Sequence, residues 1–219
     1  MKLIKPSIEC LWITPDPLGV IEQAGRTCYK SESKITPESA PKFVKMLLDR
    51  GHEAMIEHAS ASYRVICDRG VTHEIVRHRL FSYAQESTRY CNYKGGVTFI
   101  IPQWFSRPVR EGEYLDFSDL SEDRVGQFTP PEISWLCMML RNECDYQRLL
   151  SQGWSPQQAR SVLPNSLKTE IVITGNLREW RHFFKLRTAQ AAHPQMREVA
   201  DMMLANIKNQ VPIIFDDYK

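Results

Sequence analysis

Apolar residues recur along two long segments with the spacing of buried helix faces. The segment from Pro131 predicts one long helix, and the segment from Pro194 predicts another. The first predicted core face consists of Ile133, Leu136, Cys137, Leu140 and Cys144. The second consists of Met196, Val199, Met203 and Ile207.

Three shorter segments predict strands. Residues 62–67 place apolar or aromatic side chains at alternate positions, as do Thr169, Ile171 and Ile173. A third apolar run covers residues 97–101 and ends at Pro102. These runs are rich in β-branched and aromatic residues, which favours strands over short helices.

Capping signals predict the starts of four more helices. Thr36 precedes Pro37 and a helix that Gly51 closes, and Thr72 precedes a short helix whose last turn carries residues 77–79. Ser155 forms a capping box with Gln158 at the start of a helix that ends at Pro164. Asn176 forms a capping box with Glu179 at the start of the fourth helix. Residues 106–130 are polar and predict a long surface loop. No repeat or linker is visible, so we predict one mixed α/β domain over residues 1–219, with a mixed sheet flanked by helices.

Composition and charge narrow the class of protein. Hydrophobic residues make up 42% and charged residues 25%, which is ordinary for a globular domain. A net charge of +2 argues against general nucleic-acid binding. The six cysteines form no CxxC pair, and no signal peptide or membrane-length apolar run is present. We therefore expect reduced cysteines and a cytoplasmic protein that binds neither nucleic acid nor membrane.

The most informative segment runs from Arg77 to Tyr90 and is unusually rich in cationic and hydroxyl side chains. Guanidinium groups bind phosphate oxygens two at a time, so this density favours an anionic ligand. Residues 77–79 alone are more typical of a solvated basic turn. The second polar cluster, residues 87–89, shifts the interpretation toward anion binding.

The sequence offers no convincing motif for metal binding and none of the common nucleotide-binding motifs. His73 and His78 lie five residues apart, whereas a zinc helix needs a spacing of four, so we expect no metal there. His52 and His58 are compatible with a metal pair, but such residues more often have hydrogen-bonded structural roles. There is no GxGxxG motif and no Walker loop, so any nucleotide is bound in another way.

The basic segment resembles the signature of the flavin-dependent thymidylate synthases, the ThyX family. The shared pattern is Arg77-His78-Arg79, then residues 80–86, then Ser87 followed by Arg89-Tyr90. Further resemblances, in the family's order, are Gly51-His52-Glu53 with Glu57-His58, Ala159-Arg160 with Leu163-Pro164, Asn176 with Arg178, and His182 with Leu186-Arg187. Together they run from about residue 51 to 190.

This resemblance implies an enzyme, a methyltransferase that converts dUMP to dTMP. Reduced FAD activates the reaction, methylene-tetrahydrofolate donates the carbon, and NADPH reduces the flavin. The family is a homotetramer whose active sites form at subunit interfaces. The absence of a cysteine after a proline agrees with a mechanism that needs no cysteine nucleophile.

The resemblance also implies roles for individual residues. Arg187 is the catalytic residue, and it stabilises negative charge on the pyrimidine. The cofactor-binding residues are Arg77, His78, Arg79, Gln85, Asn176, Arg178 and His182. The substrate-binding residues are Glu74, Arg77, Gln85, Glu86, Ser87, Thr88, Arg89, Arg160 and Arg187, with Arg160 supplied by another subunit and Ser87 acting as a positioning hydroxyl. No metal is implied.

Helix geometry adds an independent argument. Arg178 and His182 share a helix face, whereas Arg187 lies about 180° around the same helix if it continues that far. One helix then cannot direct all three side chains into one pocket, which favours a site built from several subunits. The alternative is a non-catalytic nucleotide- or RNA-binding module that uses residues 77–79, and the near-neutral charge argues against it.

Overall fold

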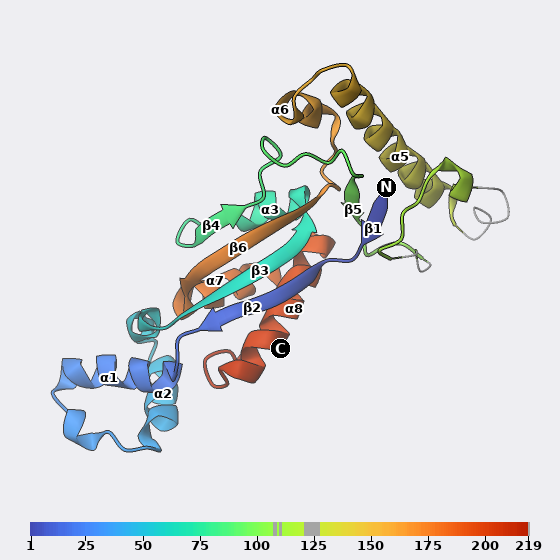
Figure 1. The fold of residues 1–219 in the computed structure, drawn as a ribbon. Helices are drawn as coiled ribbons and strands as arrows, with labels where there is room; N and C mark the ends of the chain where they lie inside the picture. The colour runs from blue at the N-terminus through green and yellow to red at the C-terminus, as the bar shows by residue number, and fades with distance from the viewer. Residues whose placement is uncertain (107–108, 110, 121–127, 219) are drawn as a thin grey trace. The chain divides into compact units, whose positions relative to one another are not determined.

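The computed structural model describes residues 1–106, 109, 111–120 and 128–218 (Figure 1). The chain packs as two compact units, each assembled from separate stretches of sequence. The first unit comprises residues 1–6, 66–73 and 85–171, and the second comprises residues 7–65, 74–84 and 172–219.

Two sheets are present among the described residues, which confirms the prediction of a mixed α/β fold. In the smaller sheet, β1 (Lys2–Ile4) pairs in parallel with β5 (Thr98–Ile100). The larger sheet has the order β2–β3–β6–β4. Its strands are β2 (Ser7–Ile13), β3 (Ser60–Asp68), β6 (Lys168–Asn176) and β4 (Ser82–Gln85). The buried residues alternate along β6, as its sequence predicts.

In the first unit, the core forms around β1, β5 and the long helix α5 (Pro130–Ser151). Thr129 and Glu132 form a capping box at its start. Of the predicted core face, Leu136 and Leu140 are buried, but Cys144 is exposed. The buried face instead continues through Met139 and Tyr146. Short helices complete the unit: η3 (Phe117–Leu120), α6 (Pro156–Ala159) and η4 (Arg160–Val162).

In the second unit, helices α7 (Leu177–Arg187) and α8 (Pro194–Gln210) pack against each other, α8 packs against β2, and both contact Tyr63 of β3. Tyr63 of β3 meets the ring of Trp180 of α7 at 5.4 Å and donates to Asn206 of α8 at 2.9 Å. The predicted apolar face of α8 is fully buried. The remaining helices are α1 (Pro17–Tyr29), η1 (Glu32–Lys34), α2 (Ser39–Asp49) and η2 (Glu53–His58).

Three predicted helix boundaries are wrong. Helix α3 (Arg69–Ile75) begins before Thr72, because Asp68 accepts from the N–H of Val71 at 2.7 Å, and it ends before residues 77–79. Helix α2 begins at Ser39 rather than after Thr36. Helix α6 continues directly into η4, which is capped by Leu163, so that helical segment ends just before Pro164, as predicted. The predicted loop at 106–130 contains η3, while residues 107–108, 110 and 121–127 lie outside the described residues. No helix in the described part of the chain is long and apolar enough to cross a membrane.

Candidate active site

The turn after α3 places a buried histidine between two exposed arginines. His78 is 4% exposed, whereas Arg77 and Arg79 are exposed. The Tyr83 hydroxyl lies 2.7 Å from the carbonyl oxygens of Ile75 and His78, which closes the turn. Among the described residues, no carboxylate pairs with Arg77 or Arg79. Both guanidinium groups are therefore available to an anionic ligand.

Arg187, the last residue of α7, is held beside this turn by three hydrogen bonds. Its Nε donates to Nε2 of His78 at 3.0 Å, and its two terminal nitrogens donate to the carboxylate and the backbone carbonyl of Glu74 at 2.9 and 3.0 Å. The side chain is 19% exposed. A guanidinium carries five N–H groups, so two remain for a ligand. Arg187 is thus fixed in position while still able to donate.

His78 is neutral in this environment. Burial, and then the positive charge of Arg187, lowers the pKa of His78 from 6.5 to about 4. Because Nε2 accepts a hydrogen bond from Arg187, the single ring proton is assigned to Nδ1. That Nδ1 faces the Glu179 carboxylate at 3.6 Å, which is longer than a hydrogen bond.

His78, Glu179 and His182 bring potential metal-ligand atoms within 4.8 Å of one another. The hydrogen bonding nevertheless fits a metal poorly. A metal ligand must present a lone pair, and both ring nitrogens of His78 are already committed, one to a proton and the other to Arg187. The nearby guanidinium also repels a cation. This cluster therefore fits an organic ligand better than a metal ion.

The other candidate residues of α7 face a second cavity. The Asn176 side chain accepts from the N–H of Glu179 at 2.8 Å and so caps the helix. Arg178 pairs with Glu57 at 2.5 Å and lies 3.6 Å from Glu53. The helix continues through Arg187, and Arg178 and Arg187 bind different carboxylates, as the helix geometry predicts.

Two adjoining cavities of the second unit collect most of these side chains. One of about 850 Å³ is lined by residues that include Asn176 and Arg178. The other, of about 310 Å³, is lined by residues that include Arg77 and Arg187. Leu80, Glu179 and His182 line both cavities, so the two cavities meet at these side chains.

The remaining candidates belong to the first unit, at the end of β4 and in the loop that follows. Gln85 donates through Nε2 to the hydroxyls of Thr72 and Thr169 at 3.0 and 3.3 Å, so its carbonyl oxygen is left as an acceptor. The Glu86 carboxylate accepts from Tyr93 at 2.6 Å and from Lys168 at 3.0 Å. These bonds make Glu86 a fixed, partly neutralised carboxylate.

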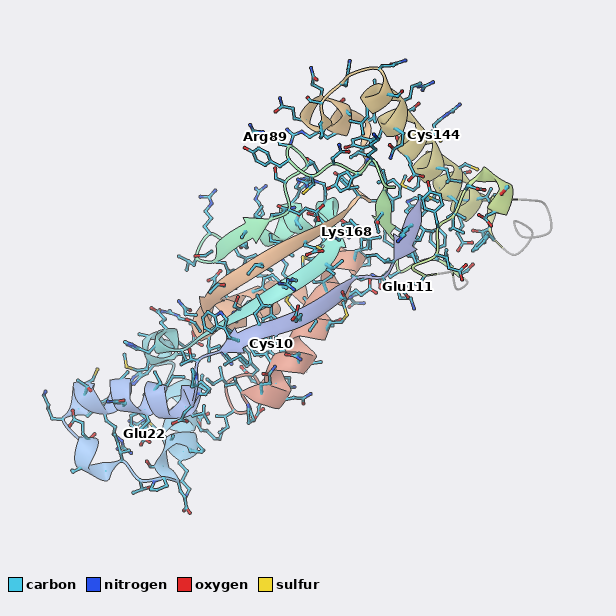
Figure 2. All side chains as sticks on the ribbon, viewed as in Figure 1. Cys10, Glu22, Arg89, Glu111, Cys144 and Lys168 are labelled. Carbon is cyan, nitrogen blue, oxygen red and sulfur yellow. The ribbon has the colours of Figure 1, made fainter. Side chains whose placement is uncertain are left out.

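Beyond Glu86, the loop presents two hydroxyls and one arginine, and Arg160 of η4 contacts it. Ser87 Oγ accepts from the N–H of Arg89 at 3.3 Å. Thr88 is buried and accepts from Arg160 of its own chain at 3.1 Å. Arg89 is exposed, with its guanidinium 5.3 Å from the ring of Tyr90. Figure 2 labels Arg89 on this loop and Lys168 on β6.

Comparison with known proteins decides the family. The sequence model of the family described as thymidylate synthase complementing protein (Thy1) matches residues 10–213, which include most of both units. The chain belongs to this family. The resemblance to the flavin-dependent thymidylate synthases is thereby confirmed.

Individual members of the Thy1 family agree in sequence and fold. A flavin-dependent thymidylate synthase of Mycobacterium avium is 33% identical over 208 residues, which cover 92% of this chain and 79% of that protein. The UMP/dUMP methylase PolB of Streptomyces cacaoi has a TM-score of 0.78 at 27% identity, covering 99% of this chain and 96% of its own. ThyX of Helicobacter pylori, solved with FAD and dUMP, has a TM-score of 0.76 over 97% and 98% of the two chains; at 21% identity it supports the fold alone.

Several residues around the Thy1-family motifs were not predicted from the sequence. Tyr83 closes the turn, Glu179 faces His78, and Tyr93 and Lys168 bind Glu86. The sequence indicated Glu179 only as part of a helix cap. Its position three residues before His182 was the one local sign that it could belong to the site. The other three have no such signal, because their partners are set by the tertiary fold.

Proposed function

We propose that this chain is a flavin-dependent thymidylate synthase. It methylates dUMP to dTMP, using FAD, methylene-tetrahydrofolate as carbon donor and NADPH as reductant. Beyond family membership, one observation carries the proposal: Arg187 is fixed beside the signature turn. Arg187 and Glu74 are 113 residues apart in sequence, yet their side chains bind each other. The alternative of a non-catalytic RNA- or nucleotide-binding module has no support in the comparisons.

The side chains of the second unit fit FAD. Arg77 and Arg79 are exposed and offer guanidiniums for an anionic group, and neutral His78 can face an uncharged ring. Asn176, Arg178 and His182 line the adjoining larger cavity. Arg178 is already paired with Glu57, so an anionic ligand must displace that carboxylate to reach it. Gln85 of the first unit is proposed as a further contact on the resemblance alone.

The loop of the first unit fits a nucleotide. Arg89 is exposed and can bind a phosphate. Arg160 contacts Thr88 within the same chain, so this pair forms without a second subunit. Ser87 and Thr88 contribute hydroxyls. Gln85 and Glu86 contribute acceptors suited to a pyrimidine or a ribose. We propose Gln85, Glu86, Ser87, Thr88, Arg89 and Arg160 as the nucleotide-binding residues of this unit. On the resemblance alone, Glu74, Arg77 and Arg187 are proposed as further substrate-binding residues.

Arg187 supplies electrostatic stabilisation. Bound reduced FAD supplies the electrons for the methylation. The protein's own contribution is a guanidinium already oriented by Glu74 and His78, with two N–H groups left to meet negative charge as it develops on the uracil ring. Because these three bonds already hold the side chain in place, Arg187 needs little reorganisation during the reaction.

The cysteines are not placed as nucleophiles. Cys67 is buried, and burial raises the pKa of its thiol, which keeps it protonated and unreactive. Cys91 follows the signature loop but is only partly exposed. Activation of the ring therefore does not depend on a cysteine.

We also propose that the protein is a cytoplasmic homotetramer with active sites at subunit interfaces. Leu80 and Leu186 are 76% and 46% exposed beside the cavity that Arg187 lines. Apolar side chains left exposed beside a polar cavity are typical of a surface that is covered in an assembly. Residues 1–219 act as a single domain, since the family match includes most of both units.

Growth of a bacterial strain that lacks thymidylate synthase tests this function in cells. The chain should support growth without added thymidine, and the matched Arg187→Ala chain, expressed at the same level, should not. If the wild-type protein is abundant and flavin-loaded in such cells but thymidine is still required, the proposed function is wrong.

A further inference from the structure

Glu179 is a buried carboxylate in the first turn of α7 with no strong partner for its charge among the described residues. It is 5% exposed, and its backbone N–H is used by the Asn176 cap. Its nearest charged or ionisable contact is Nδ1 of His78, at 3.6 Å. Burial raises the pKa of Glu179, so its position has a cost in free energy. Glu179 also lines both cavities of the unit.

The Glu179 carboxylate faces the same nitrogen of His78 to which the Arg187 hydrogen bond assigns the proton. A negative charge facing Nδ1 favours the tautomer with the proton on that nitrogen. Nε2 then has a free lone pair, which accepts the Nε–H of Arg187 at 3.0 Å. In the other tautomer, an N–H of His78 would point at an N–H of Arg187 and the hydrogen bond would be lost.

We propose that Glu179 is a positioning residue for Arg187 and acts through the tautomer of His78. This inference rests on the proposed role of Arg187 in thymidylate formation. The chain of contacts runs from Glu179 to His78 to Arg187, and Glu74 holds the far side of the same guanidinium. Glu179 itself does not need to touch the substrate.

The size of the effect follows from the geometry. In a serine-protease triad, where a carboxylate is hydrogen-bonded to the histidine, changing it to an amide lowers kcat by about 10⁴. Here the contact is 3.6 Å, longer than a hydrogen bond, and Glu74 still holds Arg187. We therefore expect Glu179→Gln to lower kcat for thymidylate formation about tenfold. FAD content and the KM for dUMP should change less than threefold.

A double-mutant cycle separates positioning from a merely structural role. Glu179→Gln, Arg187→Ala and the double variant are prepared as flavin-loaded proteins, with Asp201→Asn of α8 as a control outside both cavities. If Glu179 acts through Arg187, its substitution lowers kcat in the wild-type background but not in the Arg187→Ala background. The control should keep the wild-type rate. An equal loss in both backgrounds would overturn the proposal.

The tautomer gives a second measurement. In protein labelled with ¹⁵N-histidine, the two ring nitrogens of His78 should show the separate shifts of one neutral tautomer, and Glu179→Gln should bring them closer together. Unchanged shifts in Glu179→Gln would overturn the mechanism, even if kcat falls.

Should Glu179→Gln lose its flavin or unfold, Glu179→Asp takes its place, because it keeps the charge and moves it away from Nδ1. Glu179→Asp should lower kcat less than Glu179→Gln does. If Glu179→Asp keeps the wild-type kcat and the ¹⁵N shifts of His78 are unchanged, the proposal is wrong. Wild-type protein that makes no thymidylate would contradict the proposed function instead.

Discussion

Replacing Arg187 with alanine removes a guanidinium that makes three hydrogen bonds to Glu74 and His78. If Arg187 stabilises charge on the uracil ring, its loss costs about 2.7–4 kcal/mol in the transition state, by analogy with a lost oxyanion donor. This corresponds to a methylation rate lower by about two to three orders of magnitude. Arg187→Lys should fall in between, since one ammonium keeps the charge but cannot reproduce the planar fork.

The same substitution has a separate and smaller effect on stability. The Glu74 side chain is 32% exposed, so water can replace part of what Arg187 provides. We expect a loss of about 1–2 kcal/mol, at the low end for hydrogen bonds to charged groups. In a protein of this size, that lowers the melting temperature by about 2–8 °C. At 25 °C the variant should therefore remain folded, and its rate can be compared directly with that of the wild type.

The assay measures thymidylate formation, FAD content, dUMP affinity and NADPH oxidation with oxygen as acceptor in the same preparations. Arg187→Ala should keep its FAD and its oxidase activity while methylation falls. Arg197→Ala is the control, because this guanidinium donates to the Gln190 carbonyl and lines neither cavity. A flavin-loaded Arg187→Ala protein that forms thymidylate within threefold of the wild-type rate would remove Arg187 from the catalytic role.

Three other substitutions test neighbouring parts of the account. Arg79→Ala should lose FAD and with it every activity, and retention of FAD would show that this guanidinium does not hold the flavin. Cys91→Ser should keep dUMP turnover, whereas complete loss in a folded, flavin-loaded protein would refute a cysteine-free mechanism. His78 has its pKa lowered from 6.5 to about 4, so the native state resists protonation; about 2–3 kcal/mol of folding stability is present above pH 6.5 and is lost as the pH falls toward 4. His78→Gln should flatten the melting temperature over this range, and an unchanged slope would show that another group is responsible.

The elements that the sequence predicts best have strong local patterns. Helices α5 and α8 follow from apolar spacing, and β3 and β6 from alternation. Helix α1 and strands β1 and β2 were not predicted, and β2 is only partly buried along its length, so its alternation is weak. The start of α3 was misplaced because Asp68, inside the preceding strand, accepts the first free N–H in place of Thr72.

In the candidate site, too, some features follow from local sequence patterns and others depend on tertiary packing. The motifs predict which side chains take part, and the structure brings some of them together, as with Arg187 and His78. The pairings were not predictable, since Arg187 and Glu74 are 113 residues apart and Arg160 and Thr88 are 72 apart. Glu74 was expected to contact substrate, and the structure shows that it holds Arg187. Such contacts depend on how the elements pack, which no local pattern encodes.

Thymidylate formation by the purified protein tests the central claim most directly. Protein with its bound or added FAD is incubated with dUMP, methylene-tetrahydrofolate and NADPH under anaerobic conditions, and dTMP is measured by chromatography. We predict that dTMP forms with all components present and that omitting FAD, the folate or NADPH abolishes multiple turnover. A folded, FAD-loaded protein that binds dUMP but forms no dTMP with every component present would contradict the account.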